Sequence, residues 1–272
     1  MKSNLKQLHI PESVKTSEAV VIAGGYAMNN GMGISGPLPY PAGQPYRVPE
    51  LRVISILEGE GSLIVNLVKH DLGPGDFLLV PAGTIIEPVS FSPDARVRLL
   101  SSQTESTEKP LHIHPEKEDQ DELEPMLRTL WKALHTEPLA LDLVRFQFLA
   151  FIAKLKYIHG QVPRPQSLRA EEIFQMFIEA VNSYVSQNRR LPFFADKLGI
   201  TPHHLSAVVK DASGESAMSW IHKATVQRAK LLLSQGMTAL QVSEALEFPN
   251  APYFNRYFKR LTGQTPGEYQ KP

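Results

Sequence analysis

Short apolar stretches separated by turns that contain glycine or proline fill the chain from Ala19 to about Gln103. Each stretch is of strand length and rich in β-branched residues, and the breaks contain strong turn formers such as Gly24-Gly25. This pattern predicts a mostly β domain, and a small barrel or sandwich is the form that such strands usually adopt. We expect this domain to occupy residues 1–110.

The hydrophobic pattern becomes helical in the middle of the chain. Residues 104–125 are polar, acidic and bounded by proline, which is typical of an exposed connection that enters a helix near Glu122. Two helical segments follow, at 123–134 and 139–159. The second has an apolar stripe at steps of three or four residues, formed by Leu141, Val144, Phe148, Phe151, Leu155 and Ile158. The stripe fits a helix that pairs with a second copy of the chain, and equally a core helix packed on its own domain.

A proline-rich linker follows at residues 162–167, and the sequence beyond it has the pattern of helices and turns. We therefore divide the rest of the chain into two regions. Residues 111–167 hold the acidic connection, the candidate dimerisation helices and the linker, and residues 168–272 form an all-α domain. The chain as a whole is expected to have an α+β fold.

The helical domain contains an internal repeat, in which Thr201–Gly214 aligns with Asn250–Gly263. Each copy begins with an N-cap residue and a nearby proline, and closes with a lysine and then a glycine. Apolar residues match in pairs, which are Leu205 with Phe254, Val208 with Tyr257, and Val209 with Phe258. Because a short amphipathic helix and a tight turn precede each copy, the sequence predicts two helix-turn-helix motifs. Residues 216–234 predict one long helix, a rigid spacer between motifs that enter successive major grooves ~34 Å apart.

Composition and charge restrict the classes of function. The chain has no cysteine, which excludes disulfides, thiolate zinc sites and cysteine nucleophiles. The net charge is zero, but residues 168–272 hold 12 Lys and Arg against 9 Asp and Glu, a net of +3, which favours a nucleic-acid partner for that region. The first residues are too polar for a signal peptide, and no apolar run approaches membrane-spanning length. We expect a cytoplasmic protein without a membrane partner.

The region from Ala170 to Tyr269 resembles the DNA-binding domain of the AraC/XylS family of transcription regulators. The resemblance is carried by LGITPHHLS, by the spacer pattern W-I-x-x-x-x-x-x-x-A-x-x-L-L, and by the terminal motif F-x-x-x-x-Y-F-x-R-x-F-K-R-x-T-G-x-T-P-x-E-Y. It implies that two recognition helices enter adjacent major grooves on one face of double-stranded DNA. By position, the base-reading residues would be His203, Ser206 and Ala207 in the first helix, and Pro252, Asn255 and Arg256 in the second.

The two recognition helices differ in their capacity to read bases. Ala207 offers only a methyl group, whereas Arg256 can form two hydrogen bonds to guanine O6 and N7, so we expect the second helix to discriminate more. Phosphate contacts, which position the protein without specifying sequence, are expected from Lys210, Lys259 and Arg260. The chain departs from many family members in having Thr225 in place of Arg and Glu247 in place of Gly.

Residues 73–89 of the β domain resemble the second cupin motif, G-D-x-x-x-x-P-x-G-x-x-H, with Ile86 at the position of the metal-binding histidine. The H-x-H part of the first cupin motif is also absent, since the corresponding stretch at 44–52 is QPYRVPELR. We therefore expect no metal and no cofactor, and a cupin-like barrel that encloses a small-molecule effector. His112 and His114 form an H-x-H pattern near a glutamate, but the sequence shows no third ligand for a metal.

The favoured function is a sequence-specific DNA-binding transcription regulator controlled by an effector in the barrel. The resemblance further implies a homodimer formed by the helices that follow the barrel, and contact with RNA polymerase if the protein is an activator. Two alternatives stay open at this point. One is a cupin-type isomerase or dioxygenase with an appended helical domain, and the other is a constitutive DNA-binding dimer without an effector.

Overall fold

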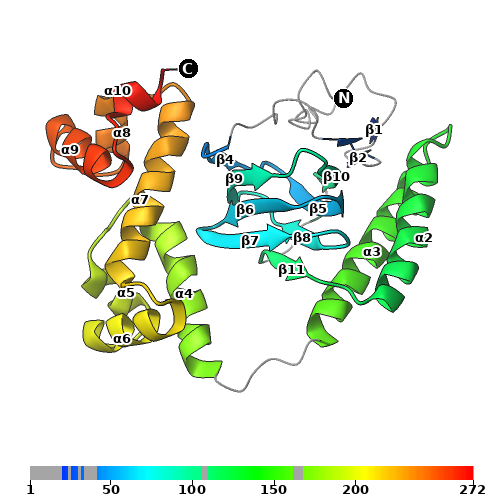
Figure 1. Cartoon of the computed structure of the whole chain (residues 1–272), viewed down its shortest axis with the longest axis horizontal. Helices are drawn as coiled ribbons and strands as arrows, with labels where there is room; N and C mark the ends of the chain where they lie inside the picture. The colour runs from blue at the N-terminus through cyan, green and yellow to red at the C-terminus, as the bar shows by residue number, and fades with distance from the viewer. Residues whose placement is uncertain are drawn as a thin grey trace. The chain divides into compact units, whose positions relative to one another are not determined.

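The computed structural model describes residues 20–23, 26–29, 32–33, 42–103, 105, 109–161 and 168–271. The predictions for the first residues, for the Gly24-Gly25 turn and for the linker at 162–167 lie outside these residues. The chain divides into an N-terminal unit, Met1–Pro163, and a C-terminal unit, Arg164–Pro272. Figure 1 shows sheets and two helices in the first unit, and only helices in the second.

The N-terminal unit contains two antiparallel sheets. The larger has the order β1 (Val20–Ala23), β2 (Tyr26–Asn29), β10 (Arg96–Ser102), β5 (Leu51–Glu58), β8 (Phe77–Val80) and β11 (Leu111–Ile113), with β3 (Met32–Gly33) paired to β10. The smaller has the order β4 (Tyr46–Arg47), β9 (Ile85–Phe91), β6 (Gly61–Val65) and β7 (Val68–Leu72). The predicted β-rich N-terminal region is confirmed. The closed barrel is not: within the described residues the strands form two separate sheets.

The central strands of the larger sheet are buried on both faces, because alternate side chains enter two different cores. Leu51 and Val53 of β5 belong to a core shared with two helices, whereas Ile54 and Ile56 belong to the core between the two sheets. Phe77 and Leu79 of β8 alternate with Leu78 and Val80 in the same way. The N-terminal unit is therefore layered as helices, larger sheet and smaller sheet, which explains why its strands are continuous apolar runs.

Two helices, α2 (Lys117–Leu134) and α3 (Leu141–Gln161), cover the outer face of the larger sheet. Five residues of the apolar stripe predicted for the second helix are at most 5% exposed in this core, namely Val144, Phe148, Phe151, Leu155 and Ile158, while Leu141 is exposed. Rings from the sheet and the helix meet directly, with 5.3 Å between the ring centroids of Tyr26 and Phe148. Of the two interpretations left open for this stripe, the structure shows the intradomain core.

The segment interpreted as an exposed connection, residues 104–125, is more ordered than the sequence suggested. It contains β11, which extends the larger sheet by pairing Leu111 with Leu79 and Ile113 with Phe77. The helix begins at Lys117 and not near Glu122. The strand was missed because Ile113, its buried residue, lies among polar residues that mask the strand pattern. The helix starts earlier than expected because acidic residues in a first turn stabilise a helix N-terminus.

The C-terminal unit consists of helices in the order that the sequence predicts. They are α4 (Leu168–Tyr184), α5 (Leu191–Lys197), α6 (Pro202–Ser213), α7 (Ala217–Ser234), α8 (Ala239–Ala245), α9 (Ala251–Thr262) and α10 (Pro266–Tyr269). The pairs α5–α6 and α8–α9 are the two helix-turn-helix motifs, hereafter the first and the second motif, and α7 joins them (Figure 1). In the described parts of the chain, no helix combines the length and apolar character needed to cross a membrane.

Candidate nucleic-acid interface

The second helices of the two motifs, α6 and α9, begin in the same way. The Thr201 hydroxyl accepts a hydrogen bond from the His204 amide at 3.2 Å, and the Asn250 side-chain oxygen accepts one from the Tyr253 amide at 2.8 Å. Each helix also has proline in its first turn. A side-chain cap satisfies an otherwise unpaired amide, and proline fixes a helical φ where no amide hydrogen is needed. The predicted start signals are therefore confirmed in both copies.

The same two helices also end alike. Gly214 and Gly263 adopt left-handed conformations with φ of 72° and 82°, and each donates its amide to the carbonyl of the predicted lysine, Lys210 or Lys259, at 2.9 Å. Glycine has no side chain to clash in this conformation, which is why it closes helices. The repeat thus extends from sequence to backbone geometry.

Each recognition helix has one buried face, which braces it against the rest of its motif. Leu205 and Val209 in α6, and Phe254 and Phe258 in α9, have 0% exposure. These residues lie at steps of four, so the opposite face of each helix is left to solvent. A brace of this kind is what a helix needs in order to project polar side chains into a major groove.

The predicted base-reading residues lie on the outward faces of the two helices. His203, Ala207, Pro252, Asn255 and Arg256 are exposed, and Ser206 is half-buried. Within each helix they are separated by steps of one, three or four residues, so they share one side of the helix. Their contacts to bases stay predictions, because the structure holds no DNA.

The predicted phosphate-binding residues Lys210, Lys259 and Arg260 are exposed as well. The Lys210 ammonium donates to the Gly214 carbonyl, and the Arg260 guanidinium lies 5.6 Å from the centroid of the Tyr257 ring. Both contacts leave hydrogen-bond donors available, since an ammonium has three and a guanidinium has five. The three cations therefore lie beside the exposed faces of α6 and α9 with hydrogen-bond donors that can still reach a phosphate.

The spacer helix α7 is tied to both motifs by side-chain hydrogen bonds. The Trp220 indole donates to the Ser213 hydroxyl at the end of α6 at 2.9 Å, and Nδ1 of His222 lies 2.7 Å from the Tyr257 hydroxyl of α9. Burial lowers the pKa of His222, and the nearby Arg260 charge adds to the effect. With 18 residues, α7 spans about 27 Å.

The two departures from the family pattern fall at different kinds of position. Thr225 is 1% exposed within α7, where its hydroxyl donates to the Ile221 carbonyl at 2.7 Å. Glu247 lies in the turn of the second motif with a φ of 52°, and its equivalent in the first motif is Gly199 with a φ of 67°. The turn therefore keeps its left-handed backbone although the second motif has no glycine there.

One residue that links the two motifs was not predicted from the sequence. Arg189, which precedes α5, donates hydrogen bonds to the carbonyl oxygens of Leu246 and Glu247 in the turn of the second motif. No local sequence signal marks it, because its partners are backbone atoms more than fifty residues away.

The two histidines with metal-like spacing lie on the N-terminal unit, beside Asp76. His112 Nε2 is 3.5 Å from one carboxylate oxygen of Asp76, and His114 Nδ1 contacts the other. The ring of His70 is 5.5 Å from that of His112, and burial, followed by repulsion from His112, lowers the pKa of His70 to about 4. No group of three or more ligating side chains among the described residues is arranged to hold a metal ion.

The position of the missing cupin histidine is part of a core. Ile86 has 0% exposure and packs between the two sheets with Val65 and Leu78. An apolar side chain at this position supplies no ligand for a metal.

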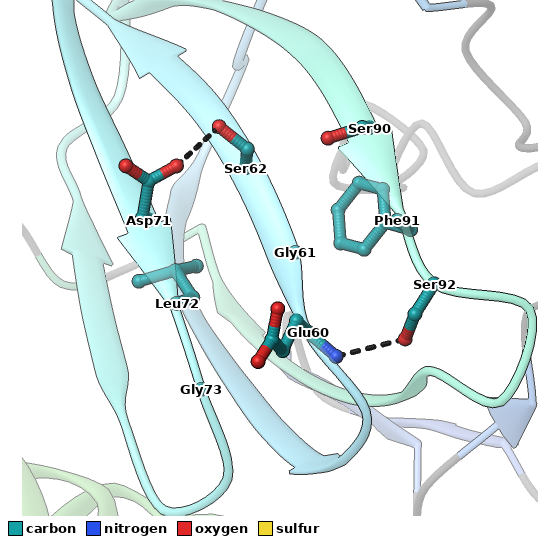
Figure 2. Close-up of a pocket in the computed structure, with 9 residues that line it drawn as sticks. All are labelled: Glu60, Gly61, Ser62, Asp71, Leu72, Gly73, Ser90, Phe91 and Ser92. Atoms are coloured by element: carbon teal, nitrogen blue, oxygen red, sulfur yellow. Dashed lines mark hydrogen bonds between the residues drawn. The ribbon is translucent and has the colours of Figure 1, made fainter.

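A hollow of about 520 Å³ with a mixed polar and apolar lining lies on the N-terminal unit at the ends of β6, β7 and β9, and Figure 2 shows this lining. The Ser62 hydroxyl donates to Asp71 at 2.8 Å, and the Glu60 amide donates to the Ser92 hydroxyl at 2.9 Å. The Phe91 ring lies against Gly61, where a Cβ atom would come within 2.5 Å of the ring. Hydroxyls, carboxylates and one aromatic ring thus meet at this surface.

Comparison with known proteins identifies the C-terminal unit. Residues 194–272 match the family model of a helix-turn-helix domain. The uncharacterized HTH-type transcriptional regulator YpdC of Escherichia coli is 24% identical over 232 residues, which cover 80% of this chain and 81% of that protein. The arabinose operon regulatory protein of Escherichia coli is 28% identical over 137 residues, or 50% of this chain and 45% of that protein. A solved structure of ToxT from Vibrio cholerae covers 91% of this chain and 98% of its own, with 15% identity and a TM-score of 0.40.

The matched domain covers the two motifs described above, and the relatives are named as transcription regulators. The chain is a helix-turn-helix transcription regulator that is similar to regulators of the AraC/XylS type.

Proposed function

We propose that this regulator reads two adjacent major grooves with α6 and α9, works as a homodimer, and responds to a small effector bound by its N-terminal unit. Residues 1–110 would then sense the effector, the helices within 111–167 would dimerise, and residues 168–272 would bind DNA. The observation that carries the proposal is the repeated geometry of α6 and α9, each braced on one face and exposed on the other.

Base reading by α9 is the sharpest part of this proposal. Arg256 is exposed on the outward face and can form a bidentate contact with guanine, so Arg256→Ala should lower specific affinity by about 1–3 kcal/mol. The matched control is Arg260→Ala, a predicted phosphate contact on the same helix, which should weaken binding to all sequences equally. The two variants are distinguished by titrating each against the DNA site that the wild type selects from random sequences and against unrelated DNA. An unchanged affinity of Arg256→Ala for the selected site would refute the assignment.

A second apolar face of α3 supports the homodimer. Leu143, Phe146 and Tyr157 are 48%, 64% and 61% exposed, on the side away from the core. With the small, exposed residues Ala150 and Ala153 they recur at steps of three and four, the spacing of a helix-pairing seam. The proposed partner face is therefore the opposite side of the helix from the stripe for which the sequence left both interpretations open.

An antiparallel pairing of α3 with α3 of a second copy matches this face in size and charge. A twofold axis near Ala150 places each Phe146 opposite the small Ala153, and each Leu143 opposite Tyr157. It also places Asp142 near Lys156, both of which are exposed. Phe146→Glu should therefore yield monomers in sedimentation equilibrium, while Met176→Glu, an equally exposed apolar position on α4, should leave the dimer intact. A wild-type chain that stays monomeric at micromolar concentration contradicts the proposal.

We assign the effector to the N-terminal unit because a hollow of about 520 Å³ lies there, with Ser62, Asp71 and Ser92 among its lining residues. The cupin-like resemblance of residues 73–89 supports the same placement, although the inter-sheet space is filled by apolar side chains. A metabolite at a hundredfold its Kd would add about 2.7 kcal/mol of stability.

The two tryptophans allow this prediction to be tested unit by unit. Trp131 lies in the N-terminal unit and Trp220 in the C-terminal unit, so single-tryptophan variants report the melting of each separately. An effector bound as proposed raises the transition reported by Trp131. A screen in which no metabolite shifts that transition favours the constitutive DNA-binding dimer.

A further inference from the structure

A single side chain connects the segment before the first motif to the turn of the second. Arg189 lies between α4 and α5, and its Nη1 and Nη2 donate to the carbonyls of Leu246 and Glu247, the second at 2.9 Å. Its Cζ atom lies 4.1 Å from the centroid of the Phe248 ring. Because these three partners are consecutive, the guanidinium holds the first half of the turn between α8 and α9.

The turn held by Arg189 is in direct contact with the second recognition helix. The ring centroid of Phe248 lies 5.3 Å from that of Phe254 and 5.1 Å from that of Tyr257, both on α9. The Tyr257 hydroxyl in turn contacts His222 of α7. The second motif is therefore held on one side by the spacer helix and on another by Arg189.

The residues around Arg189 belong to the body of the first motif. Helix α4, which ends shortly before it, packs against α5, α6 and α7. Helix α7 contributes Ala229 and Leu233 to the core of the second motif, so it holds this motif by packing along its own length. The Arg189 contact adds a separate link, from the segment before α5 to the turn of the second motif. Two hydrogen bonds to carbonyl oxygens and an aromatic face give the planar guanidinium a defined orientation, which a lysine could not reproduce.

We propose that Arg189 is a positioning residue that fixes the orientation of α9 relative to α6 and thereby sets the half-site spacing that the protein accepts. The inference rests on the proposed reading of two grooves by these helices. Successive groove faces recur every ~10–10.5 base pairs, so one inserted base pair rotates a half-site by about 34°. A rigid pair of helices tolerates this change poorly, whereas a pair free to rotate tolerates it better.

The test compares two DNA duplexes with the full-length protein. The first is the site that the wild type selects from random-sequence DNA, and the second has one base pair inserted between its half-sites. Arg189→Met removes both hydrogen bonds but keeps a side chain that packs on Phe248. We expect its affinity for the selected duplex to fall about tenfold, and the penalty for the inserted base pair to shrink severalfold.

Two further variants separate positioning from loss of charge and from loss of folding. Arg190→Met removes the same charge at the next, exposed position and should leave the ratio of the two affinities unchanged. Arg189→Lys keeps the charge but not the fork, and should fall between the wild type and Arg189→Met. If Arg189→Met lowers both affinities equally, it has only reduced the folded fraction and the inference is overturned. A wild type that selects a single half-site refutes the reading of two grooves and, with it, this inference.

Discussion

The left-handed turn of the second motif allows a direct test of how backbone strain is distributed in the C-terminal unit. Glu247 has a φ of 52°, a conformation that costs an L-residue about 1–2 kcal/mol relative to the right-handed one. Glu247→Gly removes this cost but gives the unfolded chain more freedom, which offsets about 0.4–1 kcal/mol. The net expectation is a gain of about 0.5–1 kcal/mol in the free energy of unfolding of the C-terminal unit.

This gain is measured by the melting of the C-terminal unit in a Trp131→Phe background, where Trp220 is the remaining tryptophan. A change of about 1 kcal/mol corresponds to a Tm shift of about 4–8 °C for a domain of this approximate size. We therefore expect Glu247→Gly to raise the Tm by about 2–8 °C.

Two controls separate the backbone from the side chain of Glu247. Glu247→Ala removes the carboxylate but keeps the Cβ atom, so it should leave the Tm close to that of the wild type. Gly199→Ala is the reverse change in the first motif, where a Cβ atom would meet nothing within 4 Å, and it should lower the Tm by a similar amount through φ alone. If Glu247→Ala raises the Tm as much as Glu247→Gly, the carboxylate is the source of the cost and the reasoning from φ is wrong.

Three further predictions concern other parts of the chain. Phe148→Ala in the helix–sheet core should destabilise the N-terminal unit by about 3–5 kcal/mol in urea unfolding followed by Trp131, and a loss below 1 kcal/mol would mean that the core relaxes around the cavity. Lys259→Ala should reduce the slope of log K against log salt by about 1 without changing the preferred DNA sequence, and a changed preference would make it a base contact. Burial lowers the pKa of His70 to about 4, so the folded state favours the neutral ring. The free energy of unfolding is therefore highest above pH 6.5 and falls as the pH drops from 6.5 to 4, where the unfolded state binds the proton more readily. His70→Phe should flatten the pH dependence of stability in this window, and an unchanged pH profile would count against it.

The parts of the fold that the sequence predicts best are those defined by neighbouring residues. Thr201 and Asn250 cap the helices that immediately follow them, and Gly214 and Gly263 close the same helices, so each signal lies within one or two turns of its effect. The buried faces of α6 and α9 follow from steps of three and four along a single helix. The outward placement of Asn255 and Arg256 follows from the same periodicity, by elimination.

The parts that the sequence does not predict depend on partners distant in the chain. β11 forms because Leu111 and Ile113 pair with residues of β8. A strand of three residues between polar neighbours has too short a pattern to be predicted from the sequence. The strands form two separate sheets instead of a closed barrel, and β5 of the larger sheet contributes side chains to two cores, which depend on partners far apart in the sequence. On α3, the sequence contains two apolar faces, and only the packing of α2 and the sheet shows which face is already occupied.

The strain at Glu247 and the contact of Arg189 meet at the same residue. The turn of the second motif has a residue that disfavours its backbone conformation, and the carbonyl of that residue accepts a hydrogen bond from Arg189 at 2.9 Å. A charge-assisted hydrogen bond of about 1.5–3 kcal/mol is of the same order as the cost of the left-handed φ. The first motif, with Gly199 at the equivalent position, has no such cost to offset. Glu247→Gly should therefore rescue part of the stability lost in Arg189→Met, while the loss of spacing discrimination in Arg189→Met should persist, since glycine restores the turn but not the contact that orients it.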